Sequence, residues 1–129
     1  MDLITAATVD RDFLVCGDAK GHLRFNQRSD LSSWTEKKPA HTDRITALRL
    51  TKDTIISASL DKTIKLWDRE TKKQLGMFVC SSPVVLLEVF PEVQTEVQTE
   101  VQTEVQTEVQ TQLVCGDRLG NLYFLSWTK

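Results

Sequence analysis

Four polar side chains in the middle of the sequence have types that can do chemistry together. They are His41, Ser57, Asp61 and Trp67. A serine, a histidine and a carboxylate form a nucleophilic triad when the histidine accepts the serine proton and the carboxylate orients the imidazole. Neither a nucleophile elbow nor an oxyanion-hole motif accompanies Ser57 in the sequence. A hydrolase using Ser57 and His41 is therefore kept as an alternative interpretation only.

The same four residues can instead form a structural hydrogen-bond relay. The indole of Trp67 only donates, the hydroxyl of Ser57 and a neutral His41 both donate and accept, and the carboxylate of Asp61 only accepts. Arranged in that order, they leave no buried donor without an acceptor. Leaving one partner of such a network unsatisfied costs about 1 to 3 kcal/mol. We favour this structural tetrad over the triad.

Short strands must position these residues, because their neighbours show the pattern of a β-hairpin. Residues 54–59 are rich in apolar and β-branched side chains, residues 60–63 (Leu-Asp-Lys-Thr) are polar enough to reverse the chain, and residues 64–66 alternate between apolar and polar. The pattern predicts two strands and a tight turn with one buried face. It returns without gaps over residues 13–27 and 112–126.

Taken in order, the whole chain predicts three antiparallel meanders. The first has strands over residues 3–9, 13–17 and 22–25, and a fourth around residues 32–35 before Pro39 interrupts it. The second has strands over residues 45–50, 54–59, 63–68 and 74–80, and the third over residues 84–90, 112–116 and 121–127.

The three hairpins are copies of one repeat. When Gly17, Ala58 and Gly116 are aligned as the same position, the offsets are 41 and 58 residues. The first offset suits a four-stranded unit. The second exceeds it by 17 residues, and the run over residues 92–111, five copies of Glu-Val-Gln-Thr, accounts for the excess.

The Glu-Val-Gln-Thr insert has two interpretations. As a strand, it places Val and Thr on one side and Glu and Gln on the other, and so lengthens a hairpin. As an expansion tolerated in a surface loop, it costs little if its two ends already meet, because loop-closure entropy rises slowly with length. We favour the surface loop.

Composition limits the classes of function. The chain has 129 residues, 40% of them apolar and 26% charged, with a formal net charge of −2. It shows no apolar run long enough to span a membrane and no secretory signal, so we expect a cytoplasmic protein that also enters the nucleus, with no membrane partner. Lys and Arg are scattered rather than clustered, which argues against a dedicated nucleic-acid binder.

Cys16, Cys80 and Cys115 are predicted to be reduced, buried thiols. No phosphate-binding loop or zinc-ligand spacing is present, so no cofactor and no metal site are predicted.

Residues 41–48 and 55–68 closely resemble a WD-repeat unit of a β-propeller. His41 precedes the first strand, small residues end the second, Asp61 lies in the turn, and Trp67-Asp68 closes the third. The resemblance implies an all-β fold, a partial β-propeller of about two and three quarters four-stranded antiparallel blades. It divides the chain into a degenerate blade over 1–40, the best-preserved blade over 41–82, and a last blade over 83–129 that lacks its outer strand and carries the insert 92–111.

The other two units depart from the WD pattern. The first has Asn26 where the tryptophan belongs and Lys20 at the aspartate position, and the third has Leu125 and Leu119 there. Neither has a histidine at the equivalent entry. His22 is expected to be an ordinary strand or turn residue.

Residues 74–80, together with residues 113–117 and 120–127, resemble the extreme C-terminus of large NACHT and WD-repeat proteins. The resemblance implies a non-catalytic protein-interaction scaffold, part of a longer propeller, that acts as the sensor or assembly arm of a NACHT-type protein. Its expected partners are other proteins, or the remaining blades and nucleotide-binding region of a parent chain. The alternative is a component of a telomerase-like or vault-like ribonucleoprotein that contacts RNA. The candidate partner contacts are Arg44, Thr46, Leu60 and Arg118, beside the turn aspartates.

Overall fold

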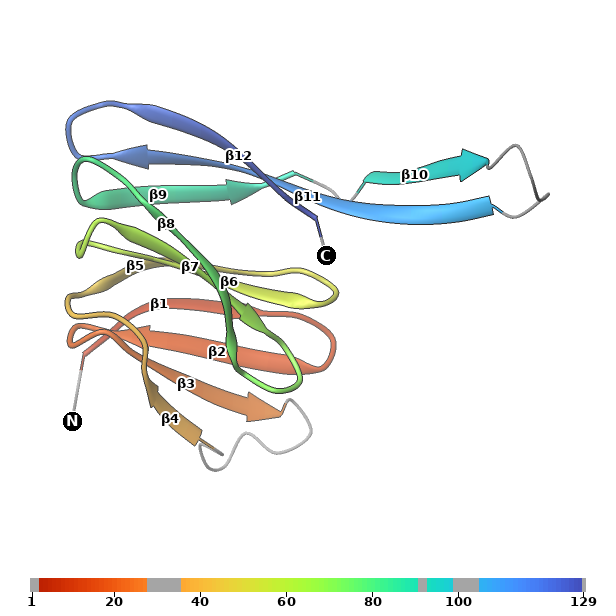
Figure 1. Cartoon of the computed structure of the whole chain (residues 1–129). Coiled ribbons are helices and arrows are strands. Elements are labelled where there is room, and N and C mark those ends of the chain that lie inside the picture. The colour runs from red at the N-terminus through yellow and green to blue at the C-terminus, as the bar shows by residue number, and fades with distance from the viewer. Residues whose placement is uncertain (1–2, 28–35, 91–92, 99–104, 129) are drawn as a thin grey trace.

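The computed structural model describes residues 3–27, 36–90, 93–98 and 105–128, and every regular element in these ranges is a β-strand (Figure 1). The predicted all-β fold class is therefore confirmed. The strands are β1 (Ile4–Val9), β2 (Phe13–Asp18), β3 (His22–Gln27), β4 (Glu36–Pro39), β5 (Ile45–Leu50), β6 (Thr54–Ser59), β7 (Thr63–Asp68), β8 (Gln74–Val79), β9 (Val84–Val89), β10 (Val93–Gln98), β11 (Val105–Asp117) and β12 (Leu122–Thr128).

The strands form three antiparallel sheets that lie one upon another as a stack (Figure 1). The first sheet is β1-β2-β3-β4 and the middle sheet is β5-β6-β7-β8, each in chain order. In the last sheet β11 pairs with β9 and β12, and β10 pairs with the part of β11 that projects beyond the stack. Among the described residues, no strand pairs with the outer edge of β12, the place that β4 and β8 take in the other sheets. The arrangement is that of successive blades in a partial propeller.

The middle sheet is covered on both of its faces. All six residues of β6, from Thr54 to Ser59, are buried. A strand with one face in water alternates between buried and exposed residues, so a continuous buried run indicates cover on both sides. The first and last sheets provide that cover.

Two apolar clusters fill the spaces between the sheets. The cluster between the first and middle sheets contains Val15, Leu23, Phe25, Ala40, Ile45, Leu48, Ile55 and Trp67. The cluster between the middle and last sheets contains Ala47, Ile56, Ala58, Ile64, Leu66, Cys80, Val84, Leu87, Leu113 and Cys115. Burying apolar surface contributes about 25 cal/mol per Å². The hydrophobic effect therefore holds the sheets face to face.

Small residues stand near the end of the second strand of each repeat because side chains approach closely there. A Cβ atom on Gly17 would lie 2.6 Å from Ile45 Cγ2, and one on Gly116 would lie 2.9 Å from Leu86 Cγ. The equivalent position in β6 is Ala58, which is completely buried. A larger side chain would clash with Ile45 of the next sheet at position 17 and with the Leu86 side chain at position 116.

The fourth strand of the first sheet lies further along the chain than predicted. It is β4, whereas the predicted strand around residues 32–35 lies outside the described residues. Pro39 is the last residue of β4, so the strand does end at this proline and includes it. An edge strand tolerates proline because its outer side has no ladder that needs the missing N–H.

The described part of the Glu-Val-Gln-Thr run is a hairpin. Residues 93–98 form β10, and residues 105–111 form the first part of β11. In their register Val93 stands opposite Gln110 and Thr95 opposite Glu108. The alternation of β-branched residues favours strands, and β11 continues without a break into the last sheet. The preference for a surface loop is therefore wrong for these residues.

Candidate functional site

The structure brings together the four polar residues of the middle sheet. Trp67 Nε1 on β7 donates to Ser57 Oγ on β6 at 2.9 Å. Ser57 Oγ lies 2.7 Å from His41 Nε2, which belongs to the segment between β4 and β5. His41 Nδ1 in turn lies 2.9 Å from Asp61 Oδ2 in the β6–β7 turn. We call these four residues the tetrad.

One arrangement of protons gives every donor in the tetrad an acceptor. Because Ser57 accepts from the indole of Trp67, its own hydroxyl proton is free to be donated to Nε2 of His41. The remaining imidazole proton then lies on Nδ1 and is donated to Asp61. Histidine is neutral in this arrangement. Burial lowers the pKa of His41, and the nearby carboxylate of Asp61 opposes that effect only in part.

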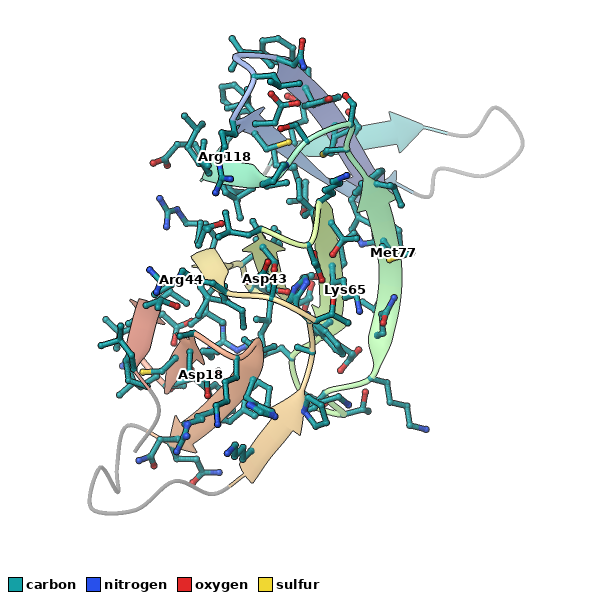
Figure 2. The ribbon with its side chains drawn as sticks, turned by 90° about the vertical axis from the view of Figure 1, so that its left-hand side faces the viewer. Asp18, Asp43, Arg44, Lys65, Met77 and Arg118 are labelled. Carbon is teal, nitrogen blue, oxygen red and sulfur yellow. The ribbon has the colours of Figure 1, made fainter. Side chains whose placement is uncertain are left out.

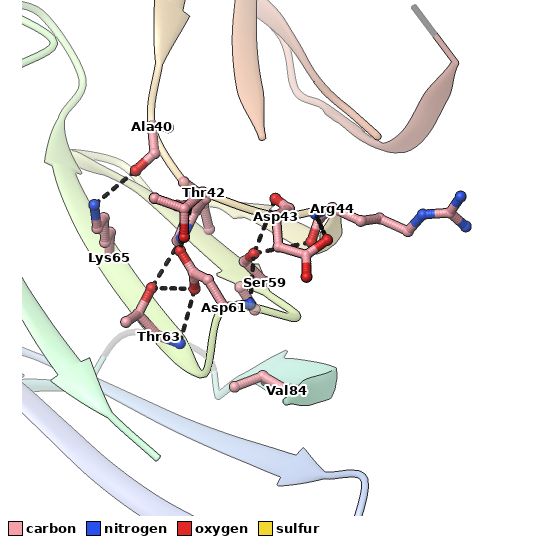
Figure 3. A network of polar contacts seen from close by, with 12 residues as sticks. Ala40, Thr42, Asp43, Arg44, Ser59, Asp61, Thr63, Lys65 and Val84 are labelled. Carbon is pink, nitrogen blue, oxygen red and sulfur yellow. Dashed lines mark hydrogen bonds and ion pairs between the residues drawn. The ribbon is translucent and has the colours of Figure 1, made fainter. Parts of the chain in front are cut away.

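Asp61 ties the β6–β7 turn to the segment before β5 (Figure 3). Its Oδ1 accepts from the backbone N–H of Thr63 at 3.0 Å and also from the Thr63 hydroxyl. Its Oδ2 accepts from the backbone N–H of Thr42 at 3.2 Å, in addition to His41. Burial alone would raise the pKa of Asp61, but these hydrogen bonds and the imidazole hold it below its usual value. The carboxylate therefore acts as a fixed acceptor that closes the turn.

The burial of Ser57 decides what the tetrad can do chemically. Ser57 has no exposed surface, and its oxygen lies between Trp67 and His41. A nucleophile needs its oxygen open to a substrate. The geometry therefore suits the relay that holds strands and loops together, and does not present Ser57 for attack.

In the last sheet, two cysteines stand where the middle sheet has His41 and Ser57. Cys80 N donates to Lys62 O at 2.8 Å, the same bond to the turn of the preceding sheet that His41 N makes at 2.9 Å. Cys80 and Cys115 are buried and hydrogen-bonded to each other. Burial raises the pKa of the Cys115 thiol to about 12. Both thiols are therefore protonated at neutral pH, and their contact takes the place that the contact between His41 and Ser57 has in the middle sheet.

Asp18 and Asp117 are buried and hold the β2–β3 and β11–β12 turns, which correspond to the turn that Asp61 holds in the middle sheet. Neither aspartate was predicted to have this role. Asp18 Oδ1 accepts from the backbone N–H groups two and four residues later, each at 2.9 Å. Asp117 Oδ1 accepts from the equivalent pair, each at 3.0 Å. The positions predicted for the turn aspartate, Lys20 and Leu119, lie two residues after Asp18 and Asp117. Both aspartates could have been found in the sequence, because each begins the same pattern, Asp-x-x-Gly, at residues 18–21 and 117–120.

The second oxygen of each turn aspartate has different partners in the two sheets. Asp117 Oδ2 accepts from Asn121 Nδ2 at 3.0 Å and from the Tyr123 hydroxyl at 2.9 Å. Asp18 Oδ2 lies 3.6 Å from Arg24 Nη2 and 3.5 Å from His22 Nδ1. Each sheet therefore closes the same turn with its own set of polar residues.

Threonine hydroxyls connect the innermost strands of successive sheets. Thr5 Oγ1 donates to Ile45 O at 2.5 Å, and Thr46 Oγ1 donates to Val84 O at 2.8 Å. The two threonines are 41 residues apart and hold the same position in β1 and β5. Val85 holds that position in β9 and has no hydroxyl. The hydroxyl of Thr46, a candidate partner contact, is thus engaged within the chain.

The other three candidate contacts lie near the β6–β7 and β11–β12 turns. Figure 2 shows Arg44 and Arg118 at this end of the strands, together with Asp43. Both arginines are exposed, and Leu60 is half-buried. Leu60 N donates to Arg44 O at 3.0 Å, and Arg118 N makes the equivalent bond in the last sheet at 2.8 Å. Their role as partner contacts stays a prediction.

Arg69 joins the middle sheet to the first sheet at the opposite end of the strands. Its Nη1 forms an ion pair with Asp10 Oδ2 at 2.5 Å and donates to Thr51 O at 2.8 Å. Its guanidinium carbon lies 4.9 Å from the centre of the Phe13 ring. The sequence gives no sign of this role for Arg69, because all of these partners are distant from it in sequence.

Within residues 3–27, 36–90, 93–98 and 105–128, no three His, Cys, Asp or Glu side chains gather as ligands for a metal ion. The same part of the chain has no helix with the length and apolar character needed to cross a membrane. The three cysteines are buried, and none of them forms a disulfide.

A stack of four-stranded antiparallel sheets that repeats about every 40 residues, with a Trp-Ser-His-Asp tetrad in its middle sheet, defines a β-propeller of the WD-repeat class. Solved structures share the fold. Sqt1 from Saccharomyces cerevisiae matches with a TM-score of 0.74 at 12% identity over 98% of this chain and 31% of its own. The computationally designed Ika4 protein matches with a TM-score of 0.65 at 17% identity over 97% of this chain and 91% of its own.

The particular family follows from the sequence. The profile of the TEP-1 C-terminal beta-propeller matches residues 41–127, and the chain belongs to this family. It is 34% identical over 105 residues to telomerase protein component 1 of Rattus norvegicus, covering 75% of this chain and 4% of that protein. With the Mus musculus protein of the same name the identity is 37% over 90 residues, covering 70% and 3%. The chain therefore spans only a few per cent of the length of these relatives.

Proposed function

We propose that this chain is a non-catalytic protein-interaction scaffold that forms part of a larger propeller. The burial of Ser57 within the tetrad carries the proposal. The residues with catalytic chemistry satisfy one another inside the middle sheet and hold its turn in place. Binding would then use the side chains that the turns support.

The interaction surface we propose is the end of the strands that carries Arg44 and Arg118 (Figure 2). Both side chains are exposed, and both are attached to backbone that hydrogen bonds hold in place. Asp43 adds a negative charge beside Arg44, so the surface carries both signs. A mixed surface of this kind favours a protein partner with complementary charges. That partner is a separate protein, or the nucleotide-binding region of a larger parent chain.

Site-specific photo-crosslinking tests this surface. A benzophenone amino acid at position 44 or 118 is expected to give discrete protein adducts in cell extract, and one at Lys73, at the other end of the strands, is the control. Equal labelling from all three positions would contradict the proposal. A parallel esterase assay of the wild type and Ser57→Ala is expected to show no turnover that depends on Ser57.

RNA binding is a second candidate. It is supported by the exposed Arg44 and Arg118 on one end of the molecule and by the printed name of the relatives, telomerase protein component 1. Contacts between arginine and phosphate weaken steeply with salt. Fluorescence anisotropy with a single-stranded RNA should then show binding at low salt that Arg44→Gln and Arg118→Gln reduce. Absence of binding at low salt would remove this candidate.

We propose further that in a NACHT-type protein the propeller serves as the sensor or assembly arm, in the cytoplasm and also in the nucleus. Three buried cysteines without a disulfide support a reducing compartment. Microscopy of a fluorescent fusion tests the location, and a fusion that enters the secretory pathway would contradict it.

A further inference from the structure

Two adjoining cavities form a groove at the end of the strands opposite Arg44 and Arg118. The first cavity, of about 480 Å³, is lined by residues of the β1–β2, β5–β6 and β7–β8 turns, where the first and middle sheets meet. The second, of about 530 Å³, lies where β5 and β9 end. Asp10 and Lys52 line both cavities, so the groove is continuous. Each cavity has a volume within the range of about 300 to 1,000 Å³ that ligand sites occupy.

The second cavity is the mainly apolar half of the groove. Leu50 packs against the apolar cluster between the first and middle sheets, and Val89 against the cluster between the middle and last sheets. Phe90 is 46% exposed, and its backbone N–H donates to a carbonyl of β11 at 2.8 Å. The cation on this wall, Arg49, is ion-paired with Glu88 at 2.9 Å. A half-exposed aromatic residue on a fixed backbone is the kind of anchor that a partner covers.

The first cavity is the acidic half of the groove. Five carboxylates line it against two cations. The carboxylates belong to Asp10, Asp12, Asp53, Asp68 and Glu70. Of the two cations, Lys52 and Arg69, the second is only 8% exposed and forms an ion pair with Asp10. The open part of this cavity is therefore negatively charged, which favours a partner with positive charge.

Two of these carboxylates are held in place within the chain. Asp10 Oδ1 accepts from the backbone N–H groups two and three residues later, at 2.9 and 3.0 Å. Asp68 Oδ1 accepts from the same two positions after it, each at 2.9 Å. Burial alone would raise the pKa of Asp10, but Arg69 and these backbone donors hold it below its usual value. Fixed, ionised acceptors lose little freedom when a partner binds.

The spacing of the carboxylates indicates the kind of cation that fits. Among the described residues, no three acidic, histidine or cysteine side chains gather closely enough to hold a metal ion. Positively charged side chains along a peptide can instead reach separate carboxylates. The apolar half adds a requirement for an apolar group near Phe90, which a simple polyamine does not meet. A peptide with both kinds of side chain matches both halves of the groove.

We propose that this groove binds an extended peptide segment of a protein partner. Arginine or lysine side chains of the segment occupy the acidic half, and an apolar side chain covers Phe90 in the other half. The walls of the groove come from places where neighbouring sheets of this chain meet. The groove lies at the other end of the strands from Arg44 and Arg118, so it does not depend on the surface proposed there.

Fluorescence anisotropy of labelled peptides with the whole chain tests the groove. The probes carry a pair of arginines and a pair of leucines, in both orders, with one to four glycines between the pairs. Serines replace the leucines in one set of control peptides, and glutamines replace the arginines in the other. We expect a probe that binds with a Kd below about 100 µM and controls that bind at least about tenfold more weakly.

Three results with these peptides would overturn the proposal. One is the absence of binding by every order and spacing up to about 1 mM. Another is equal affinity of the serine controls, because the apolar half would then have no role. The third is displacement of the probe by spermine at concentrations no higher than those of unlabelled probe, which would indicate a site for any polycation.

Matched substitutions locate the bound peptide. Asp12 is 73% exposed, so Asp12→Asn removes one carboxylate of the groove and leaves the fold in place. It should weaken binding about two- to fivefold and reduce the effect of salt. Asp43→Asn removes one exposed carboxylate at the opposite end and should leave binding unchanged. Phe90→Ser should weaken binding about fivefold or more, with the effect of salt retained. Equal effects of Asp12→Asn and Asp43→Asn would show attraction by net charge alone and would overturn the proposal.

Discussion

Replacing Ser57 with alanine removes two buried hydrogen bonds at once. The Trp67 indole N–H loses its acceptor at 2.9 Å, and His41 Nε2 loses its donor at 2.7 Å. Trp67 is 3% exposed and His41 is 7% exposed, so water cannot replace the hydroxyl without opening the sheet. Each unsatisfied buried group costs about 1 to 3 kcal/mol. We expect the free energy of unfolding to fall by about 2 to 5 kcal/mol, a large part of the 5 to 15 kcal/mol typical of a domain.

Urea unfolding of the whole chain, followed by tryptophan fluorescence and circular dichroism, measures this loss. Ser57→Cys should lose less than Ser57→Ala, because a thiol keeps weak donor and acceptor character and Cys115 occupies the same position in the last sheet. Ser81→Ala is the matched control, since it also removes a hydroxyl hydrogen bond, 2.6 Å from the Tyr123 hydroxyl, but one that is exposed to solvent. The control should change stability by no more than about 0.5 kcal/mol.

Two results would refute this account of the tetrad. A Ser57→Ala variant within about 0.5 kcal/mol of the wild type would show that the relay does not stabilise the middle sheet. An enzymatic activity that disappears in Ser57→Ala while stability stays unchanged would instead favour the nucleophilic triad.

Three further predictions concern other positions. Arg69→Met should lower the free energy of unfolding by about 1 to 2 kcal/mol, because the ion pair between Arg69 and Asp10 is partly buried. Arg49→Met is the control: it removes an exposed ion pair with Glu88 and should lower the free energy of unfolding by less than about 0.5 kcal/mol. Equal losses in urea unfolding would contradict the bridging role of Arg69. The folded pKa of His41 lies below its unfolded value of 6.5, so its contribution is fully present above pH 6.5 and is lost as pH falls. Unfolding at pH 7.5 and 5.5 should show the loss, and His41→Gln should remove it. Lys62 has a φ of 75° where the other two turns have glycine, so Lys62→Gly should raise the thermal midpoint, with a gain of about 0.5 to 1 kcal/mol.

The sequence by itself determined the class of fold and the composition of the tetrad. Alternation of apolar and polar residues with period two is a local property of a strand, and the repeat shows the same strand-turn-strand pattern again in other parts of the chain. The residues of the hairpin at 54–68 therefore predict both β6 and β7 and which side chains could form the relay. Their types already limit the order of donors and acceptors, because a tryptophan can only donate and an aspartate can only accept.

Only the tertiary structure decided the features that depend on contacts between sheets or on competing local choices. The sequence suggested Thr46 as a partner contact and gave no role to Arg69, and the partners of both side chains within the chain become visible only when the sheets are stacked. The sequence allowed a loop or a strand for the Glu-Val-Gln-Thr run, and we favoured the loop, but the part that the structure describes is a hairpin whose second strand continues into the last sheet as β11. Burial decided the interpretation of Ser57, because accessibility depends on what packs over a strand and not on the strand itself.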